Sequence, residues 1–421
     1  MAEPSLIPDD LLRQIIGVGQ VDLLIGLTTY QHATTAGDVA AAVRACWRTH
    51  FPRLRTALLN VDGGSSDGTP LVVQHAWDDG TRTAGVPSGL RTTHCITSVV
   101  PEITDPGRGT RVLLAAGDLL QAGTIVVLDA DALLAPGGIA ALAAGVRDHG
   151  ADLVAPVYTR PAGDGLLVTQ LVRPLVRAAF ARRLQEPLLP EFACSGRLAA
   201  QCTQAAWTAN AAERGTHFWI AAQALSGAFA LHQCALGPRN VVAGRARQSL
   251  QELFGLVVGS VFAGLDAHSD AWLGRSGSEP IAGSTAGPDE GPQAEPPSDG
   301  SRLLQSFAQD VANLTEILRT ILGPDTLAGL LAASAEPGSA EFPDPLWAAT
   351  LADFLTAYHR AVMRRTHIAQ ALLPLYMARS GAFLLAHRGS TAGAVEEADE
   401  TLGACLEELK PRIVERWAQP A

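Results

Sequence analysis

Short apolar runs that alternate with helical segments dominate the first 160 residues of the chain. The runs lie at residues 21–27, 54–61, 94–100, 124–128 and 153–158. Between them, residues 37–50 and 111–122 repeat apolar side chains at helical spacing. Runs that are apolar throughout are typical of strands buried on both faces of a parallel sheet. The alternation with helices of about a dozen residues therefore predicts a doubly wound α/β fold.

The second half of the chain has a different pattern. Helical periodicity continues at residues 251–263, 303–321, 347–387 and 393–408, and the segment at 303–321 is amphipathic. Gly, Ser, Pro, Ala, Asp and Glu dominate residues 274–301, where Ile281 is the only large apolar side chain. This composition is typical of a disordered surface insertion. We therefore expect an α/β domain at 1–270, an insertion at 271–301 and an α-helical C-terminal region at 302–421.

Composition limits the partners and the compartment. The 421 residues are 47% hydrophobic, which suffices for one large or two moderate cores. The net charge of −11 and the lack of basic runs argue against a nucleic-acid partner. The N-terminus shows no basic-then-apolar signal, and no window of about 18 apolar residues is free of charge. Six scattered cysteines without a Cys-x-x-Cys pair indicate reduced thiols. We expect a cytoplasmic protein without a membrane partner.

Two aspartates, Asp129 and Asp131, come directly after the run at 124–128. Ligands of α/β sheets bind beyond the carboxyl ends of the strands. Two carboxylates at this spacing can approach a nucleotide together with a divalent cation, which prefers oxygen ligands and bridges phosphates. The alternative is an ordinary strand-to-turn pair that caps a following helix.

A second loop, at residues 62–69, follows the run at 54–61. Its glycines allow tight backbone turns near a ligand, and Asp62 can accept hydrogen bonds from a base or ribose. The alternative is that Ser66 to Thr69 only cap the next helix. As a sequence signal, the loop is more specific when it is followed by the Asp-x-Asp pair than when it stands alone.

A third loop, Gly107-Arg108-Gly109-Thr110, precedes the helical segment at 111–122. Backbone N–H groups at a helix N-terminus favour phosphate, and an arginine adds a bidentate donor. The alternative is a plain turn after Pro106.

With these motifs in this order, the chain resembles the retaining GT-A glycosyltransferases typified by mannosylglycerate synthase, glucosylglycerate synthase and glucosyl-3-phosphoglycerate synthase. The resemblance covers most of the chain. Its segments are residues 26–30, 62–69, 107–110, 129–131, 154–160, 195–196, 342–347 and 374–379. It implies a GT-A-type, mostly parallel sheet in which the first 270 residues bind a nucleotide sugar, and a helical tail through which two copies pair as a homodimer.

The resemblance also implies roles for individual residues. Thr28, Tyr30 and Asp62 would hold the nucleotide. Gly107, Arg108, Gly109 and Thr110 would lie near the donor phosphates, with Arg108 in place of the usual Lys. Asp129 would contact the donor ribose or sugar, and Asp131 would bind Mg²⁺ or Mn²⁺, which aids departure of the diphosphate. Residues of the acceptor site would be Arg160, Asp164, Glu191 and Ser195.

Several positions depart from the family pattern. The Gly-Gly-Asp-Phe-type loop before Ser-Gly retains only Glu191, Phe192 and the Ser-Gly pair. His217 stands where the family has an Asp, and Val241 where it has the metal-binding His. Without that His, the metal is held more weakly, or a cation such as Arg239 or Arg245 replaces it. His217 is a substitute catalytic or metal-binding residue or, alternatively, a buried supporting histidine.

The acceptor segment after Arg160 has Leu166 in place of an expected Thr, which favours an acceptor other than glycerate. The leading hypothesis is thus a retaining glycosyltransferase that moves a hexose from a UDP- or GDP-sugar to a small hydroxylated acceptor. The alternative is a catalytically degenerate homologue that binds a nucleotide sugar without turnover. A third reading, a nucleotidyltransferase or other Rossmann-like enzyme, is disfavoured because no Gly-x-Gly-x-x-Gly follows the first strand.

Overall fold

The computed structural model describes residues 6–78, 93–100, 106–160, 163–207, 215–239, 250–283, 300–335 and 342–419. They form two compact units. The sheet unit comprises Met1–Tyr158, Leu188–Arg245 and Ile281–Ala286, and the helical unit comprises Thr159–Pro187, Ala246–Pro280 and Gly287–Ala421. Both units are discontinuous in sequence, so their limits differ from the expected boundaries at residues 270 and 302.

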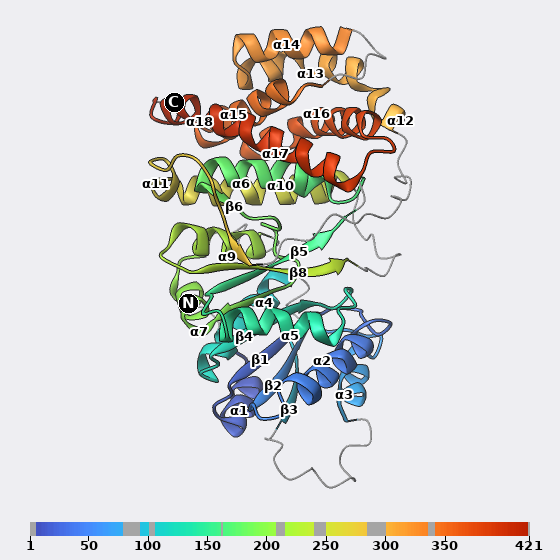
Figure 1. The fold of residues 1–421 in the computed structure, drawn as a ribbon, viewed down its shortest axis with the longest axis vertical. Coiled ribbons are helices and arrows are strands. Elements are labelled where there is room, and N and C mark those ends of the chain that lie inside the picture. Colours follow the sequence, from blue (N-terminus) through green and yellow to red (C-terminus); the bar gives the residue numbers. More distant parts are fainter. Residues whose placement is uncertain are drawn as a thin grey trace. The chain divides into compact units, whose positions relative to one another are not determined.

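The sheet unit is built on eight strands in the order β10-β8-β5-β7-β4-β1-β2-β3 (Figure 1). The strands are β1 (Leu23–Thr29), β2 (Thr56–Asp62), β3 (Thr93–Val99), β4 (Thr124–Asp129), β5 (Leu153–Thr159), β7 (Phe192–Ser195), β8 (Leu231–Pro238) and β10 (Ala282–Gly283). Strand β1 is parallel to β2 and β4, and β2 is parallel to β3. Strand β7 is antiparallel to both β4 and β5. The expected α/β fold with a mostly parallel sheet is confirmed.

The two faces of β1 bury different neighbours, because successive side chains of a strand point to opposite faces. Leu23, Ile25 and Leu27 belong to the apolar cluster that the helices α2 (Ala36–His50) and α5 (Pro136–Arg147) cover. On the other face lies α4 (Pro106–Leu119), and a Cβ atom at Gly26 would come within 2.6 Å of the Leu113 side chain. Burial on both faces explains why the strand is apolar throughout.

Seven helices of the sheet unit lie among the described residues. They are α1 (Asp9–Val18), α2 (Ala36–His50), α3 (Thr69–Asp78), α4 (Pro106–Leu119), α5 (Pro136–Arg147), α7 (Gly196–Gln204) and α9 (Thr216–Ser226). Helix α4 begins at Pro106, so the predicted phosphate loop at residues 107–110 is the first turn of the helix itself.

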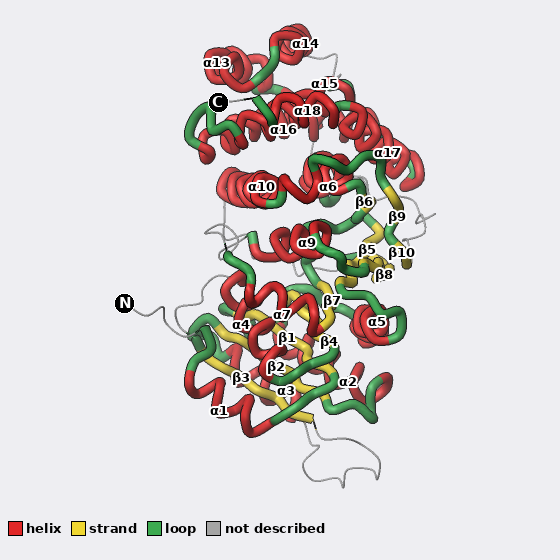
Figure 2. The backbone as a smooth tube through the Cα atoms, turned by 90° about the vertical axis from the view of Figure 1, so that its left-hand side faces the viewer, coloured by secondary structure: helices red, strands yellow, loops and turns green. Residues whose placement is uncertain are grey.

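Helices in stacked layers make up the helical unit (Figure 2). They are η1 (Val168–Val172), α6 (Arg173–Phe180), α10 (Leu250–Ala267), α11 (Ser269–Trp272), α12 (Gly300–Leu304), α13 (Phe307–Ile321), α14 (Pro324–Ala335), α15 (Asp344–His359), α16 (Arg365–Ala386), α17 (Ala392–Glu408) and α18 (Lys410–Trp417). Helix α16 contacts α10, α12, α13 and α15. The expected C-terminal helical region is confirmed, with the periodic stretch at 347–387 divided into α15 and α16.

Gln170 joins segments of the helical unit that are far apart in sequence. Its side chain donates to Asp399 at 2.7 Å and accepts from Arg379 at 3.0 Å, and its carbonyl accepts from the Trp347 indole at 2.6 Å. These bonds make residues 159–187 part of the helical unit.

Helix α16 is long and apolar enough to cross a membrane, but 72% of its most apolar window is buried inside the protein. This degree of burial is that of a core helix.

Part of the stretch assigned to a disordered insertion is ordered. Strand β9 (Glu279–Pro280) pairs with β6 (Arg182–Arg183), and β10 pairs with β8. Ile281, between the two strands, is buried and supplies the apolar anchor that the composition of the stretch otherwise lacks. Residues 284–299 lie outside the described residues.

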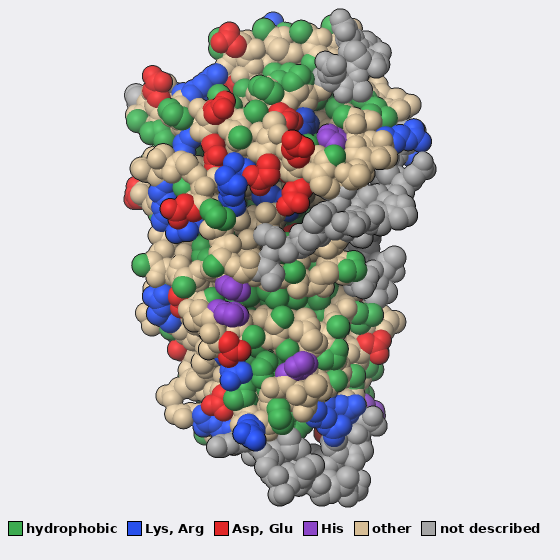
Figure 3. Space-filling view, viewed as in Figure 1, with side chains coloured by type: hydrophobic (Ala, Val, Ile, Leu, Met, Phe, Trp, Pro, Cys, Tyr) green, Lys and Arg blue, Asp and Glu red, His purple; other side chains and the backbone are tan. Residues whose placement is uncertain are grey.

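Charged side chains are interspersed on the face of the molecule drawn in Figure 3, where neither sign gathers into one patch among the described residues. Nucleic-acid binding needs clustered positive charge. This face therefore gives no indication of a nucleic-acid partner.

Candidate functional site

The strand order reverses direction between β1 and β4. From β1 the chain passes outward to β2 and then β3, and it returns to form β4 on the other side of β1. In open α/β sheets, ligands bind beyond the carboxyl ends of the strands at this reversal. Thr28 of β1 pairs in register with Asp129 of β4. Two residues predicted to bind the donor therefore lie side by side where the topology favours a ligand.

The loop after β1 reaches the second aspartate. The backbone N–H of Tyr30 donates to His32 Nδ1 at 2.8 Å, so the ring proton of His32 is on Nε2. That atom lies 3.3 Å from Asp131 Oδ2, and the Thr35 hydroxyl lies 3.3 Å from Asp131 Oδ1. The sequence interpretation missed His32, whose only signal was its place in the loop after the first strand.

Asp62 holds its own loop in shape. Its Oδ1 accepts from the backbone N–H groups of Gly64 at 3.0 Å and Ser65 at 2.7 Å. Its Oδ2 accepts from the hydroxyls of Thr29 at 2.8 Å and Ser65 at 2.7 Å. The side chain is buried, and four protein donors occupy both oxygens. These four bonds hold the loop at residues 62–69 in shape. The expected contact of Asp62 with a ribose or base stays a prediction.

A hydrogen bond from the Asp131 backbone to the Asp129 side chain joins the two aspartates. The N–H of Asp131 donates to Asp129 Oδ1 at 3.0 Å, which turns the chain sharply after β4. The other oxygen, Oδ2, accepts from Arg239 Nη2 at 2.9 Å. The side chains of Asp129 and Asp131 are 35% and 20% exposed, so both can still be reached by a ligand.

Arg239, the first residue after β8, joins Asp129 to Glu191. Its Nη2 lies 3.1 Å from Glu191 Oε1, while the Tyr158 hydroxyl donates to Glu191 Oε2. Burial raises the pKa of Glu191, although Arg239 opposes the shift. Burial tends to lower the pKa of Arg239, but Glu191 and Asp129 outweigh it and raise that pKa, so Arg239 keeps its charge. Glu191, expected in the acceptor site, is fully buried and binds the same arginine nitrogen as Asp129 does.

The first turn of α4 and the start of α9 meet at His217. Its Nε2 lies 3.1 Å from the Thr110 hydroxyl, and its ring packs edge-on against Phe192 with centroids 5.7 Å apart. Burial lowers the pKa of His217, while Asp129 and a hydrogen bond to the Leu189 backbone oppose that shift. These contacts fit a buried supporting histidine, which was the alternative to a catalytic or metal-binding role. Arg108 is exposed on the same turn as the buried Thr110.

The four predicted acceptor residues are divided between the units. Arg160 and Asp164 belong to the helical unit, where Arg160 binds Glu186 Oε1 through Nη2 at 2.7 Å and Asp164 at 3.3 Å. Glu191 and Ser195 belong to the sheet unit.

The antiparallel direction of β7 determines where Ser195 lies, and its role in the acceptor site stays a prediction. Strand β7 is antiparallel to β4, so Ser195 pairs with Thr124 at the amino end of β4. At about 3.3 Å per residue, Asp129 lies roughly 16 Å away at the other end of that strand. The Ser195 hydroxyl instead donates to Asp152 at 2.7 Å and caps α7 by accepting from Leu198 N at 3.2 Å.

The side chains at this edge do not fit the expected Mg²⁺ or Mn²⁺. Among the described residues no three His, Cys, Asp or Glu side chains are grouped to hold a metal ion. Asp129 Oδ2 faces the Arg239 guanidinium, and both oxygens of Asp131 face His32 and Thr35. Val241, which stands at the place of the missing metal-binding His, and Arg245, the other cation expected to replace the metal, lie outside the described residues.

The protein matches no family model and no curated protein sequence. Solved structures similar to it include glucosyl-3-phosphoglycerate synthase from Mycobacterium tuberculosis in complex with Mg²⁺ and uridine diphosphate. That match has 19% identity and a TM-score of 0.44, and covers 63% of this chain and 84% of the other. The same enzyme with Mn²⁺, UDP-glucose and phosphoglyceric acid matches at 18% identity and a TM-score of 0.42, over 62% and 85% of the two chains.

Similarity at this level concerns the fold. The residues of the site carry the functional proposal.

Proposed function

We propose that the protein is a glycosyltransferase that takes a hexose from a nucleotide-diphosphate sugar and transfers it to a small hydroxylated acceptor. The observation that carries the proposal is the position of Asp129 and Asp131. They follow β4 at the reversal of strand order, beside Thr28 and the His32 loop. This is where a GT-A-type enzyme would hold its donor, and the loops at 28–35 and 62–69 are tied together there.

The chemistry proposed for this site is a substitution at the anomeric carbon. The bond from that carbon to the diphosphate oxygen breaks, and a bond to the acceptor oxygen forms. The diphosphate leaves with the electron pair, and the acceptor proton passes to one of its oxygens. The retained configuration follows from the family resemblance, and it fits a site in which no carboxylate needs to serve as a separate base.

The residues around the site would bind and orient the donor. The exposed Arg108 in the first turn of α4 adds positive charge to a helix N-terminus, which favours phosphate. The buried Asp62 and Glu191 would hold the loops and Arg239 in place rather than react. We propose an acceptor other than glycerate, because the segment after Arg160 departs from the family pattern at Leu166.

Calorimetric titration of the full chain with UDP, GDP and their glucose and mannose conjugates tests this proposal. We expect one of the two nucleotides to bind, and we expect Asp129→Ala to weaken that binding at least tenfold. Failure of every nucleotide and nucleotide sugar to bind would refute the proposal.

The second candidate is a homologue that binds a nucleotide sugar without turnover. The ion pair between Arg239 and Asp129 favours it, because an arginine holds an oxygen expected to face the donor. Release of free hexose or of a glycosylated product from a bound nucleotide sugar would separate the two candidates. Formation of a glycosylated product by the wild type, strongly reduced in Asp131→Ala, establishes the transferase and excludes the degenerate homologue.

A further inference from the structure

Arg239 makes fewer hydrogen bonds than its surroundings allow. Both of its ion pairs, to Asp129 at 2.9 Å and to Glu191 at 3.1 Å, use the single atom Nη2. Its Nε is buried and has no hydrogen-bond partner among the described residues. A guanidinium offers five N–H donors, and a buried donor without a partner is unfavourable. The arrangement therefore leaves donor capacity for a further acceptor group.

The position of this arginine matters as much as its free donors. It is held on Asp129, the first residue of the Asp-x-Asp pair, at the edge of the sheet where strand order reverses. Glu191 beneath it is fully buried, and the Tyr158 hydroxyl fixes the other carboxylate oxygen. A guanidinium clamped in this way keeps one orientation, which limits the conformational entropy that ligand binding would otherwise cost.

A divalent ion would have to enter beside this fixed positive charge. Like charges at close range in a partly buried site repel strongly. The ion would also need ligands that are already in use, since Asp131 faces His32 and Thr35. Arginine, by contrast, matches the planar, bidentate geometry of phosphate oxygens.

We propose that Arg239 takes the place of the divalent cation, and that the protein binds the diphosphate of its donor without a metal ion. This inference rests on the proposed function and specifies how that site recognises its substrate. The guanidinium donates to the diphosphate oxygens and neutralises the negative charge that develops on the leaving group. Asp129 and Glu191 hold the guanidinium.

The test is calorimetric titration of the full chain with UDP and GDP, once with EDTA and once with MnCl₂. For the nucleotide that binds, we expect dissociation constants within about threefold of each other in the two solutions. Loss of binding in EDTA that Mn²⁺ restores would overturn the inference and leave the proposed function intact. Lack of nucleotide binding in both solutions would overturn the proposed function itself, and this inference with it.

A variant then assigns the effect to the arginine. Arg239→Ala should weaken nucleotide binding in EDTA at least tenfold, whereas the exposed control Arg319→Ala in α13 should bind as the wild type does. Unchanged binding by Arg239→Ala would refute the assignment. Removal of Arg239 leaves Glu191 buried without its cation, so thermal unfolding of the variant is measured alongside. The comparison of EDTA with Mn²⁺ in the wild type decides the inference without any variant.

Discussion

Arg177 of the helical unit is buried and Arg239 of the sheet unit is partly buried, and both lie among carboxylates, yet they use their donors differently. Arg177 binds Glu407 through Nε at 3.0 Å and through Nη2 at 3.2 Å, and Glu400 through Nη1 at 2.7 Å. All three of its nitrogens therefore have partners. Arg239 binds two carboxylates through one nitrogen, and its Nε has no partner in the part of the chain that the structure describes.

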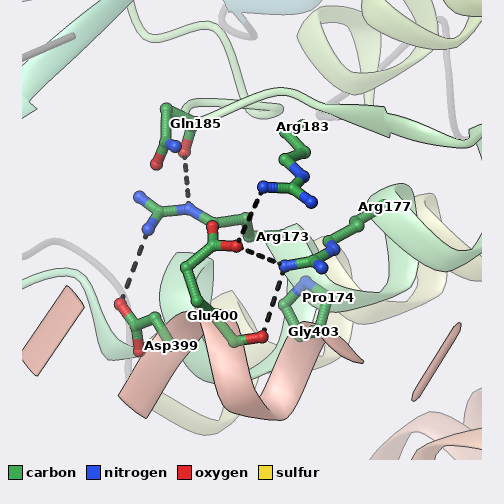
Figure 4. Close-up of a pocket in the computed structure, with 8 residues that line it drawn as sticks. All are labelled: Arg173, Pro174, Arg177, Arg183, Gln185, Asp399, Glu400 and Gly403. Carbon is green, nitrogen blue, oxygen red and sulfur yellow. Dashed lines mark hydrogen bonds and ion pairs between the residues drawn. The ribbon is translucent and has the colours of Figure 1, made fainter. Parts of the chain in front are cut away.

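The surroundings of Arg177 explain why all three of its nitrogens have hydrogen-bond partners. It lines a pocket together with Arg173, Arg183, Asp399 and Glu400, and Figure 4 shows these side chains joined to one another by ion pairs. Each charged side chain of the cluster already has a partner of opposite sign, so a ligand would have to break existing pairs. Arginines of this kind join helices, whereas an arginine with unused donors beside partly exposed aspartates can serve a ligand.

The largest effect should come from Asp131→Ala in the sheet unit. We expect glycosyl transfer to fall by roughly 10²-fold, because Asp131 holds the loop after β1 through His32 and Thr35, and misplaced donor-binding groups cost about that much. Initial rates with the nucleotide sugar that binds, and a thermal unfolding curve, measure the two sides of this prediction. The exposed control Asp118→Ala in α4 should retain full activity. Unchanged activity of Asp131→Ala would move the site away from this edge of the sheet.

Arg177→Ala should instead act on stability. Its removal leaves Glu407 and Glu400 without their common partner. Because the Glu400 side chain is 41% exposed and keeps Arg183, we expect a loss of about 3 kcal/mol of unfolding free energy, the lower end for a buried ion pair. Urea denaturation of the full chain measures this loss. The exposed Arg319→Ala should change stability by less than about 0.5 kcal/mol. If Arg177→Ala stays stable but loses nucleotide binding, Arg177 binds the ligand as Arg239 is proposed to do, and the contrast between the two arginines is wrong.

A smaller effect should appear in the dependence of stability on pH, through Asp399. Burial raises the pKa of Asp399 to about 6, although Arg173, Arg379 and Gln170 oppose the shift. Because the pKa in the folded state is the higher one, its contribution is complete below the unfolded pKa near 3.8 and is lost as pH rises through about 6. The total is at most about 3 kcal/mol.

Urea denaturation between pH 4 and pH 7 measures this dependence. Stability of the wild type should fall over that range by the contribution of Asp399, and Asp399→Asn should remove that part of the slope because it cannot titrate. An unchanged slope in the variant would show that Asp399 titrates at an ordinary pKa.

The first strands of the sheet and the end of β4 could be predicted because their signals are local. The run from Leu23 to Leu27 is apolar because both faces of β1 are buried, and Asp129 follows β4 directly along the chain. Amphipathic spacing likewise located α13. In these cases the apolar residues that form the sequence pattern are the ones buried in the strand or helix.

Other features depend on contacts between distant segments, which no local pattern records. His32 meets Asp131, and Arg239 meets Asp129, only because β1, β4 and β8 belong to the same sheet. Gln170 binds Asp399 within the helical unit. Residues 159–187 therefore group with the C-terminal helices, although the sequence pattern assigned them to the α/β domain. The reversed direction of β7, which carries Ser195 away from Asp129, is equally invisible in the sequence of that short strand.

The smallest predicted effect is that of Ser195→Ala, which tests the antiparallel direction of β7. The Ser195 hydroxyl caps α7 and donates to Asp152, so Ser195→Ala should lower stability by about 1 kcal/mol, the usual loss for an N-cap. Thr391→Ala is the matched control, since Thr391 caps α17 through one longer hydrogen bond of 3.4 Å and should cost less. Because Ser195 lies at the end of β4 opposite Asp129, kcat and KM should stay at wild-type values. A rise of tenfold in the KM for the acceptor, with stability unchanged, would return Ser195 to the acceptor site and contradict the antiparallel placement of β7.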